Sequence, residues 1–247
     1  MTNHTVEISP QIYARIGGVL YLIIIVLGAV GELFIRGRVV VPGDAMATAA
    51  NLKAMESLWR FGIASKLFLG ICTITFSLIL YVLLRPVNKD LALLATFFGL
   101  VAVAVEVAYS LQLVEALFPL GNAAYLEAFT PDQLYALVSL SLRAHANGFG
   151  IALLFFGCFF PIAGYLIFKS GYFPKAIGIL YLIPGLSYLT SSFALILAPT
   201  FADRYYFVMA GPALIGEASL CLWLLVKGVN VQQWKKQVGV SEAAISV

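Results

Sequence analysis

The sequence predicts an all-α protein: a polytopic transmembrane helix bundle of about six spans, with both termini in the cytoplasm. Of its 247 residues, 62% are apolar and only 11% are charged, whereas soluble globular proteins carry roughly 25% charged residues. So few charges cannot cover a surface that faces water, so lipid must surround much of the chain. The apolar residues also form six long runs, and a helix needs about 20 such residues to cross a membrane.

We place the spans at residues 14–35, 58–84, 91–118, 147–168, 176–198 and 206–226. Helices in the outer loops are expected at residues 44–56 and 131–146, the second with Thr130 as its cap and Pro131 at its first position. One helical domain, residues 14–229, thus lies between an N-terminal tail (1–13) and a C-terminal tail (230–247), both cytoplasmic. The first run could be a signal peptide, but no basic cluster precedes it, so we expect the mature protein to retain it.

Basic residues near the span ends determine the predicted orientation, because loops rich in lysine and arginine stay in the cytoplasm. Arg36 and Arg38 oppose this orientation, since they would lie outside. The larger number of basic residues favours it, and these residues are Arg85, Lys89, Lys169, Lys175, Lys227, Lys235 and Lys236.

Ionisable side chains inside a span are energetically expensive and mark candidate functional sites. With a rise of about 1.5 Å per residue, Glu32 and Lys66 lie roughly 25 and 28 Å from the inner boundary, while Glu106 and Glu217 fall near the middle of the membrane. Since most such groups fall in the outer half, we predict a polar cavity open to the outer face. Its candidate ligand-binding or ion-binding residues are Glu32, Lys66, Glu106, Tyr109, Glu115, Arg143, His145, Asn147 and Glu217.

Three functions are compatible with this pattern. The first is binding or transport of a small molecule or an ion through the cavity. The second is an accessory or sensory module, in which the polar residues only hold the helices together. The third is a hydrolase or transferase that acts on lipid with His145 and a carboxylate. The common motifs of hydrolases, metalloproteases and phosphate-binding loops are absent, so no catalytic residue is assigned.

We expect no metal and no cofactor. His145 is the one histidine in the membrane region, since His4 lies in the N-terminal tail, so a haem held by two histidines cannot form within the chain. The three cysteines lie inside apolar runs and are typical of core residues. No basic stripe with interleaved aromatic residues points to nucleic acid. The expected surroundings are a lipid bilayer, with a small molecule, a lipid or an ion as ligand and no predicted protein partner.

Two short stretches of the chain are similar to each other. Residues 15–23 resemble residues 175–183, and each stretch begins a predicted span from the cytoplasmic side. The similarity reflects either a parallel duplication or two similar helix starts in apolar sequence.

Several motifs resemble a known family. They are GYLIFKSGYFPKAIGIL at residues 164–180, ARIGG at 14–18, LYVLLRPVN at 80–88, and Gly216-Glu217 followed by LWLLVKG at 222–228. Over about residues 12–229 the chain resembles the bacterial family called domain of unknown function 4386. The resemblance implies a multi-pass protein of the bacterial cytoplasmic (inner) membrane and gives weight to Glu217, but it implies no reaction. The family pattern predicts an arginine at position 99, and this chain departs from it with Gly99.

Overall fold

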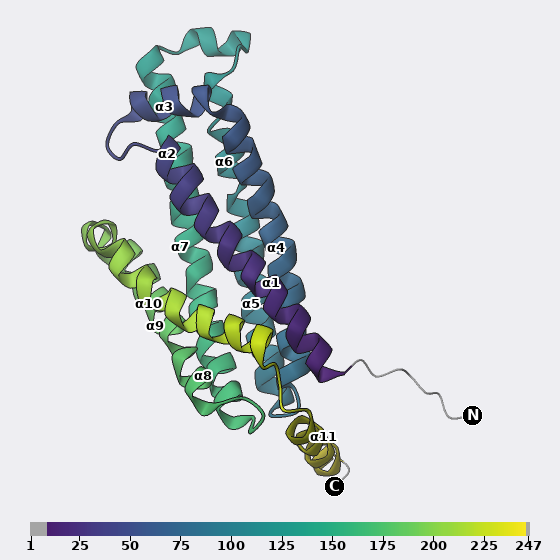
Figure 1. Ribbon diagram of the computed structural model, residues 1–247. Coiled ribbons are helices and arrows are strands. Elements are labelled where there is room, and N and C mark those ends of the chain that lie inside the picture. The colour runs from purple at the N-terminus through teal and green to yellow at the C-terminus, as the bar shows by residue number, and fades with distance from the viewer. Residues whose placement is uncertain (1–8, 246–247) are drawn as a thin grey trace.

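The computed structural model describes residues 9–245, apart from the side chains of residues 203–210 and 242–245. Within this part of the chain every regular element is a helix, and the helices form one elongated bundle (Figure 1). Five helices are long and apolar enough to cross a membrane, or six if a bent pair near the C-terminus counts as one span. The predicted fold class is therefore confirmed. His4 lies outside the described residues.

The spans follow one another up and down the bundle. The first span consists of α1 (Pro10–Ala29), a π-helical stretch (Val30–Arg36) and α2 (Gly37–Val39). The second is α4 (Glu56–Leu84), the third is α5 (Lys89–Tyr109) with α6 (Leu111–Glu115), and the fourth is α7 (Pro131–Lys169). The fifth is α8 (Lys175–Leu180) with α9 (Leu182–Leu197), and the sixth is α10 (Pro199–Val226). The shorter helices are α3 (Ala45–Ala54), two 3-10 turns (Phe118–Leu120 and Ala124–Ala128) and α11 (Val231–Ile245).

Two segments differ from the boundaries that the sequence suggested. The helix expected at residues 131–146 is the first part of α7, which continues without a break into the fourth span behind a capping box of Thr130 and Gln133. The segment 230–247 contains α11, which turns by 104° from the last part of α10. Val231, Trp234 and Val238 give α11 one apolar face. The indole of Trp234 donates a hydrogen bond to the Leu83 carbonyl, which fastens α11 to the bundle.

The two ends of the bundle differ in charge. Helices α4, α7 and α10 end, and α5 and α8 begin, at one end, which we call the basic end because it carries Arg85, Lys89, Lys169, Lys175 and Lys227. The other end carries α3 and the 3-10 turns and is called the loop end. The start of α1 and the helix α11 both lie at the basic end (Figure 1), as an even number of spans requires. That this end faces the cytoplasm stays a prediction.

Side-chain contacts hold the basic end together. The amide of Gln11 donates to the Lys227 carbonyl at 2.9 Å and accepts from the Val229 amide at 2.9 Å, so it joins α1 to the turn after α10. Gly228 in this turn has φ +72°, a conformation that L side chains rarely adopt. The hydroxyl of Tyr172, in the loop between α7 and α8, donates to the Leu83 carbonyl at 2.6 Å. Burial raises the pKa of this hydroxyl, so it remains a donor.

Proline and glycine determine how α10 crosses the fifth span. Pro184 has no amide hydrogen, and its ring crowds the carbonyl of Leu180, so the span breaks into α8 and α9 at Tyr181. A Cβ atom at Gly216 would collide with that carbonyl and with the Pro184 ring. Glycine at this position therefore lets α10 lie directly against the break, and this contact places the next residue, Glu217, inside the bundle.

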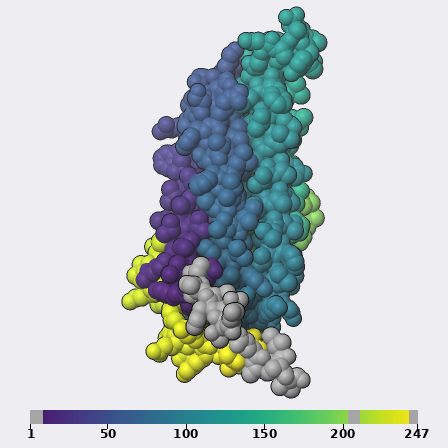
Figure 2. All heavy atoms as spheres, turned by 90° about the vertical axis from the view of Figure 1, so that its right-hand side faces the viewer, coloured from purple at the N-terminus to yellow at the C-terminus, as the bar shows by residue number. Residues whose placement is uncertain are grey.

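Two apolar cores lie near the two ends of the molecule. The larger one, with Tyr21, Leu83 and Tyr181 among its residues, fills the half near the basic end. The smaller one, with Trp59 and Leu142, lies under α3 at the loop end. Figure 2 shows the face formed by α4 and α5, where the side chains of the two helices cover the surface continuously.

The contact between α7 and α8 gives a first prediction. A Cβ atom at Gly178 would lie 2.6 Å from the Phe168 amide nitrogen and 2.8 Å from the Gly164 carbonyl oxygen. We expect Gly178→Ala to destabilise the protein by about 1–3 kcal/mol, because the two backbones must separate. Thermal unfolding in detergent measures this change. The control is Gly211→Ala, where none of the atoms that the structure describes lies within 4 Å of the added carbon, and an equal loss in both variants would contradict this explanation.

Candidate functional site

A cavity of about 390 Å³ lies inside the bundle between α1, α4, α5, α7, α9 and α10. Small-molecule sites have volumes of about 300–1,000 Å³. The wall follows the first span from Tyr21 to Ile35, which corresponds to about 21 Å at the helical rise. The cavity is thus long and narrow. Much of its lining is aromatic, from Trp59, Phe76, Phe149, Phe156, Phe159 and Phe160.

The exposed part of the lining is on the side of the bundle. Gly28 and Ala29 on α1, Glu32 on the π-helical stretch and Leu214 on α10 line the cavity and are also exposed at the surface. Near the basic end α1 and α10 are in tight contact, since a Cβ atom at Gly18 would lie 2.8 Å from the Leu225 nitrogen. Toward the loop end the two helices diverge (Figure 1). The mouth of the cavity therefore lies between α1 and α10 on the lipid-facing side, and an opening to the outer face stays a prediction.

An ion pair forms the polar group nearer the loop end. The Lys66 ammonium lies 2.8 Å from a Glu106 carboxylate oxygen, and these side chains are only 22% and 9% exposed. The same ammonium lies 4.8 Å from the centre of the Phe149 ring. One turn along α4, a Cβ atom at Gly70 would lie 2.9 Å from Val107, so glycine brings α4 and α5 together at this pair. Along the axis of the bundle, Glu106 thus lies at the same level as Lys66. It does not lie at the level of Glu217, the other carboxylate predicted near the middle of the membrane.

His145 faces the same end of the cavity and is only 5% exposed. Neither ring nitrogen has a hydrogen-bond partner among the described residues. A buried polar group without a partner is uncommon and requires an explanation. A neutral imidazole offers one donor and one acceptor, so His145 can hydrogen-bond to a ligand that has a hydroxyl, carbonyl or amine group.

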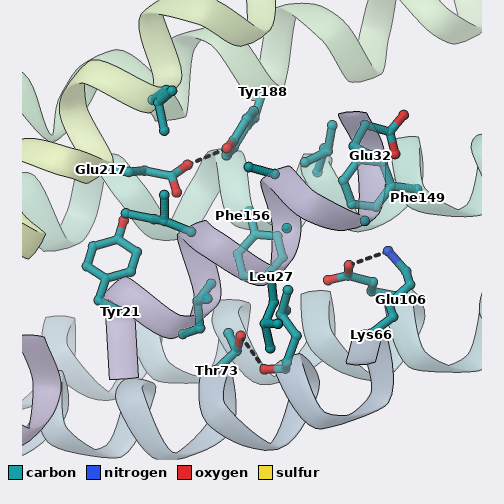
Figure 3. Close-up of a pocket in the computed structure, with 18 of the residues that line it drawn as sticks. Tyr21, Leu27, Glu32, Lys66, Thr73, Glu106, Phe149, Phe156, Tyr188 and Glu217 are labelled. Atoms are coloured by element: carbon teal, nitrogen blue, oxygen red, sulfur yellow. Dashed lines mark hydrogen bonds and ion pairs between the residues drawn. The ribbon is translucent and has the colours of Figure 1, made fainter. Parts of the chain in front are cut away.

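A second polar group lies further toward the basic end. The hydroxyl of Tyr188 donates a hydrogen bond to the Glu217 carboxylate, and the Tyr21 hydroxyl points toward this carboxylate (Figure 3). The hydroxyl of Tyr181 lies 3.3 Å from that of Tyr21. These two tyrosines occupy corresponding positions in the two similar stretches of sequence, 160 residues apart. Figure 3 shows Phe156 and Leu27 between this group and the Lys66–Glu106 pair.

Five of the nine predicted site residues line the cavity: Glu32, Lys66, Glu106, His145 and Glu217. The other four do not. The ring of Tyr109 lies directly over the backbone of Gly148. Glu115 is half-buried on α6, and Arg143 and Asn147 are exposed on α7. The prediction of a single polar cluster is therefore replaced by two polar groups at different levels of one cavity.

Sequence reasoning missed the aromatic lining, although the spacing of residues along α7 contains the signal. His145, Phe149, Leu153, Phe156 and Phe160 follow one another at intervals of three or four residues and all line the cavity. The π-helical stretch from Val30 to Arg36, which places Glu32 and Arg36 at the wall, has no comparable signal in the sequence. Stretches of π-helix are frequent at functional sites. No group of three side chains suited to a metal ion occurs in the described part of the chain.

The ion pair gives a second prediction. We expect Lys66→Met or Glu106→Leu alone to destabilise the protein by about 3–5 kcal/mol, because each leaves its partner unpaired inside the bundle. The double variant Lys66→Met/Glu106→Leu should recover most of this loss. Thermal unfolding of all three variants in detergent measures the coupling, and additive losses would contradict it.

The matched control is the i,i+4 pair of Glu56 and Arg60. Its atoms are equally close, at 2.7 Å, but its side chains are 49% and 60% exposed. Exposed pairs contribute little to stability, so Glu56→Gln should leave the unfolding temperature nearly unchanged.

Comparisons with known proteins agree with the resemblance seen in the motifs. An uncharacterized protein of Archaeoglobus fulgidus is 29% identical over 164 residues, which cover 66% of this chain and 81% of that protein. No solved structure gives a significant match. Since the relative is archaeal, location in a bacterial inner membrane stays a prediction. The model of the family described as "Domain of unknown function (DUF4386)" matches residues 16–228, so this multi-pass membrane protein belongs to that family.

Proposed function

We propose that the protein binds a small molecule with an elongated apolar body inside the membrane, in the cavity described above. The observation that carries the proposal is His145, a buried imidazole that lines the cavity and has no hydrogen-bond partner among the described residues. A hydrogen bond from a ligand would satisfy it. The aromatic lining suits the apolar body of such a ligand, since small-molecule sites combine apolar walls with a few polar groups.

The side mouth between α1 and α10 supports entry from the lipid. Leu214, on the rim of the cavity, is 53% exposed, and its neighbour Ile215 is also exposed. A ligand that is already dissolved in the hydrocarbon region reaches this mouth without crossing water. This geometry supports the binding of a ligand. Transport would also require a second opening of the cavity, through which the ligand leaves.

His145 also distinguishes ligand binding from a polar network that only holds the helices together. In such a network each buried polar side chain satisfies another, as Lys66 and Glu106 do. His145 contributes no such bond, so its burial costs free energy without strengthening the fold. A binding role explains this placement, because the partner arrives with the ligand.

The first test uses the fluorescence of Trp59, which is buried and lines the cavity. Trp223 and Trp234 are replaced by phenylalanine, and the protein is titrated with 2-bromododecan-1-ol, whose bromine lies beside the hydroxyl that bonds His145 and quenches indole on contact. We expect saturable quenching. Gly28→Phe should abolish it, because the nearest described atom to a Cβ there, on Leu69, is 3.8 Å away and the ring can enter the cavity. Gly211→Phe adds the same ring outside the lining and should bind normally. Linear quenching, or equal quenching in both variants, would contradict the proposal.

The second test replaces the imidazole by a ring of similar shape. We expect His145→Phe to keep or raise the thermal stability, because it removes an unsatisfied buried polar group. The same variant should bind 2-bromododecan-1-ol up to about tenfold more weakly, since it loses one hydrogen bond. A loss of stability with unchanged binding would assign His145 to the structure of the protein instead.

A further inference from the structure

We infer that the ligand class of this cavity is the lipophilic organic cation, with its charged group beside Glu217 and among Tyr21, Tyr181 and Tyr188. The inference rests on the proposed binding function and adds the charge of the ligand and the end of the cavity at which that charge lies. Its basis is the distribution of charged and aromatic side chains along the wall.

The charges of the lining do not balance. Glu32, Glu106 and Glu217 are carboxylates, whereas Arg36 and Lys66 are the cations among the described lining residues. Both cations already have partners, since Arg36 lies 3.4 Å from Glu32 and Lys66 lies 2.8 Å from Glu106. Glu217 is the carboxylate that remains. In the part of the chain that the structure describes, no basic side chain lies within 4.0 Å of it.

A carboxylate inside the membrane requires compensation for the water that it has lost. The hydroxyl of Tyr188 donates a hydrogen bond to Glu217, but a hydroxyl carries no net charge. A cationic group of a ligand supplies the missing charge. An anionic ligand would instead meet an unpaired carboxylate here, and at the other end it would find cations that are already paired.

The rings beside Glu217 pack edge to face against one another and form one aromatic wall of the cavity. The ring centres of Phe160 and Tyr181 are 4.8 Å apart, those of Phe160 and Tyr188 are 5.5 Å apart, and those of Tyr21 and Tyr181 are 6.4 Å apart. All four rings line the cavity. The negative faces of aromatic rings attract alkylammonium groups, and groups of such rings recognise quaternary ammonium ligands.

The remainder of the cavity determines the shape of the ligand. From Glu217 the wall continues past Phe156 and Leu27 to the level of Lys66 and Glu106 (Figure 3). His145 lines the same end, one turn of α7 from the Phe149 ring that contacts Lys66. An alkyl or aryl body therefore extends from the charged group toward the loop end, where His145 accepts or donates one hydrogen bond. A cation with an apolar chain matches both the charge and the length of this space.

The experiment measures binding of radiolabelled decyltrimethylammonium to the protein in phosphatidylcholine nanodiscs, after subtraction of the partitioning into empty nanodiscs. Decan-1-ol and decyl sulfate serve as competitors with the same chain. We expect saturable binding, at least tenfold weaker competition by either competitor than by the unlabelled cation, and at least a tenfold loss of affinity in Glu217→Gln. Glu56→Gln is the matched control and should bind the cation with unchanged affinity, because it removes a carboxylate that does not line this cavity.

The outcomes separate this inference from the proposed function. If decan-1-ol competes as well as the cation does, or if Glu217→Gln binds the cation with unchanged affinity, the ligand class is wrong while the binding cavity stands. If neither the cation nor 2-bromododecan-1-ol binds saturably, both proposals are wrong. Quenching of Trp59 by the bromoalcohol checks that Glu217→Gln is folded. If this variant does not fold, the competition with the wild-type protein decides the question alone.

Discussion

Lipid offers no hydrogen-bond partner, so each polar side chain inside the bundle depends on the protein, or on a bound molecule, to satisfy it. Hydroxyl groups follow this rule locally, as Thr73 and Ser77 do by donating to the carbonyls of Leu69 and Thr73, one turn earlier in α4. Lys66 and Glu106 follow it by pairing across two helices. His145 does not follow it among the described residues, and this exception is the reason to regard the cavity as a binding site rather than a packing defect.

Glycines and one proline determine where the polar groups lie in the bundle. Gly70 lets α4 approach α5 at the level of the ion pair, and Gly216 lets α10 lie against the break that Pro184 makes in the fifth span. At Gly18 the close contact of α1 with α10 seals the cavity toward the basic end. Because α10 then diverges from α1, the same contact leaves an opening on the lipid-facing side (Figure 1). Small residues thus determine both the position of the charged groups and the route to them.

The sequence predicts the fold class and most of the spans, because apolar runs of about 20 residues have one common interpretation. It also separates the faces of α7, since the spacing of four between Arg143 and Asn147 puts these two residues on one exposed face and His145 on another. It does not predict which helices are neighbours, so the pairing of Lys66 with Glu106 and of Tyr188 with Glu217 comes only from the structure. Counting along single helices put Glu106 and Glu217 both near the middle of the membrane, whereas Glu106 pairs with Lys66 nearer the loop end and the oblique course of α10 keeps Glu217 nearer the basic end (Figure 1).

The central claim is that the space between His145 and Glu217 holds a ligand. The most direct measurement is an experimental structure of the protein in nanodiscs made from its own membranes, without added ligand. We expect elongated density that is not protein, in contact with His145 and extending past Phe156 toward Glu217. A closed cavity, in which His145 bonds to another side chain and α1 meets α10 along the whole of its length, would contradict it.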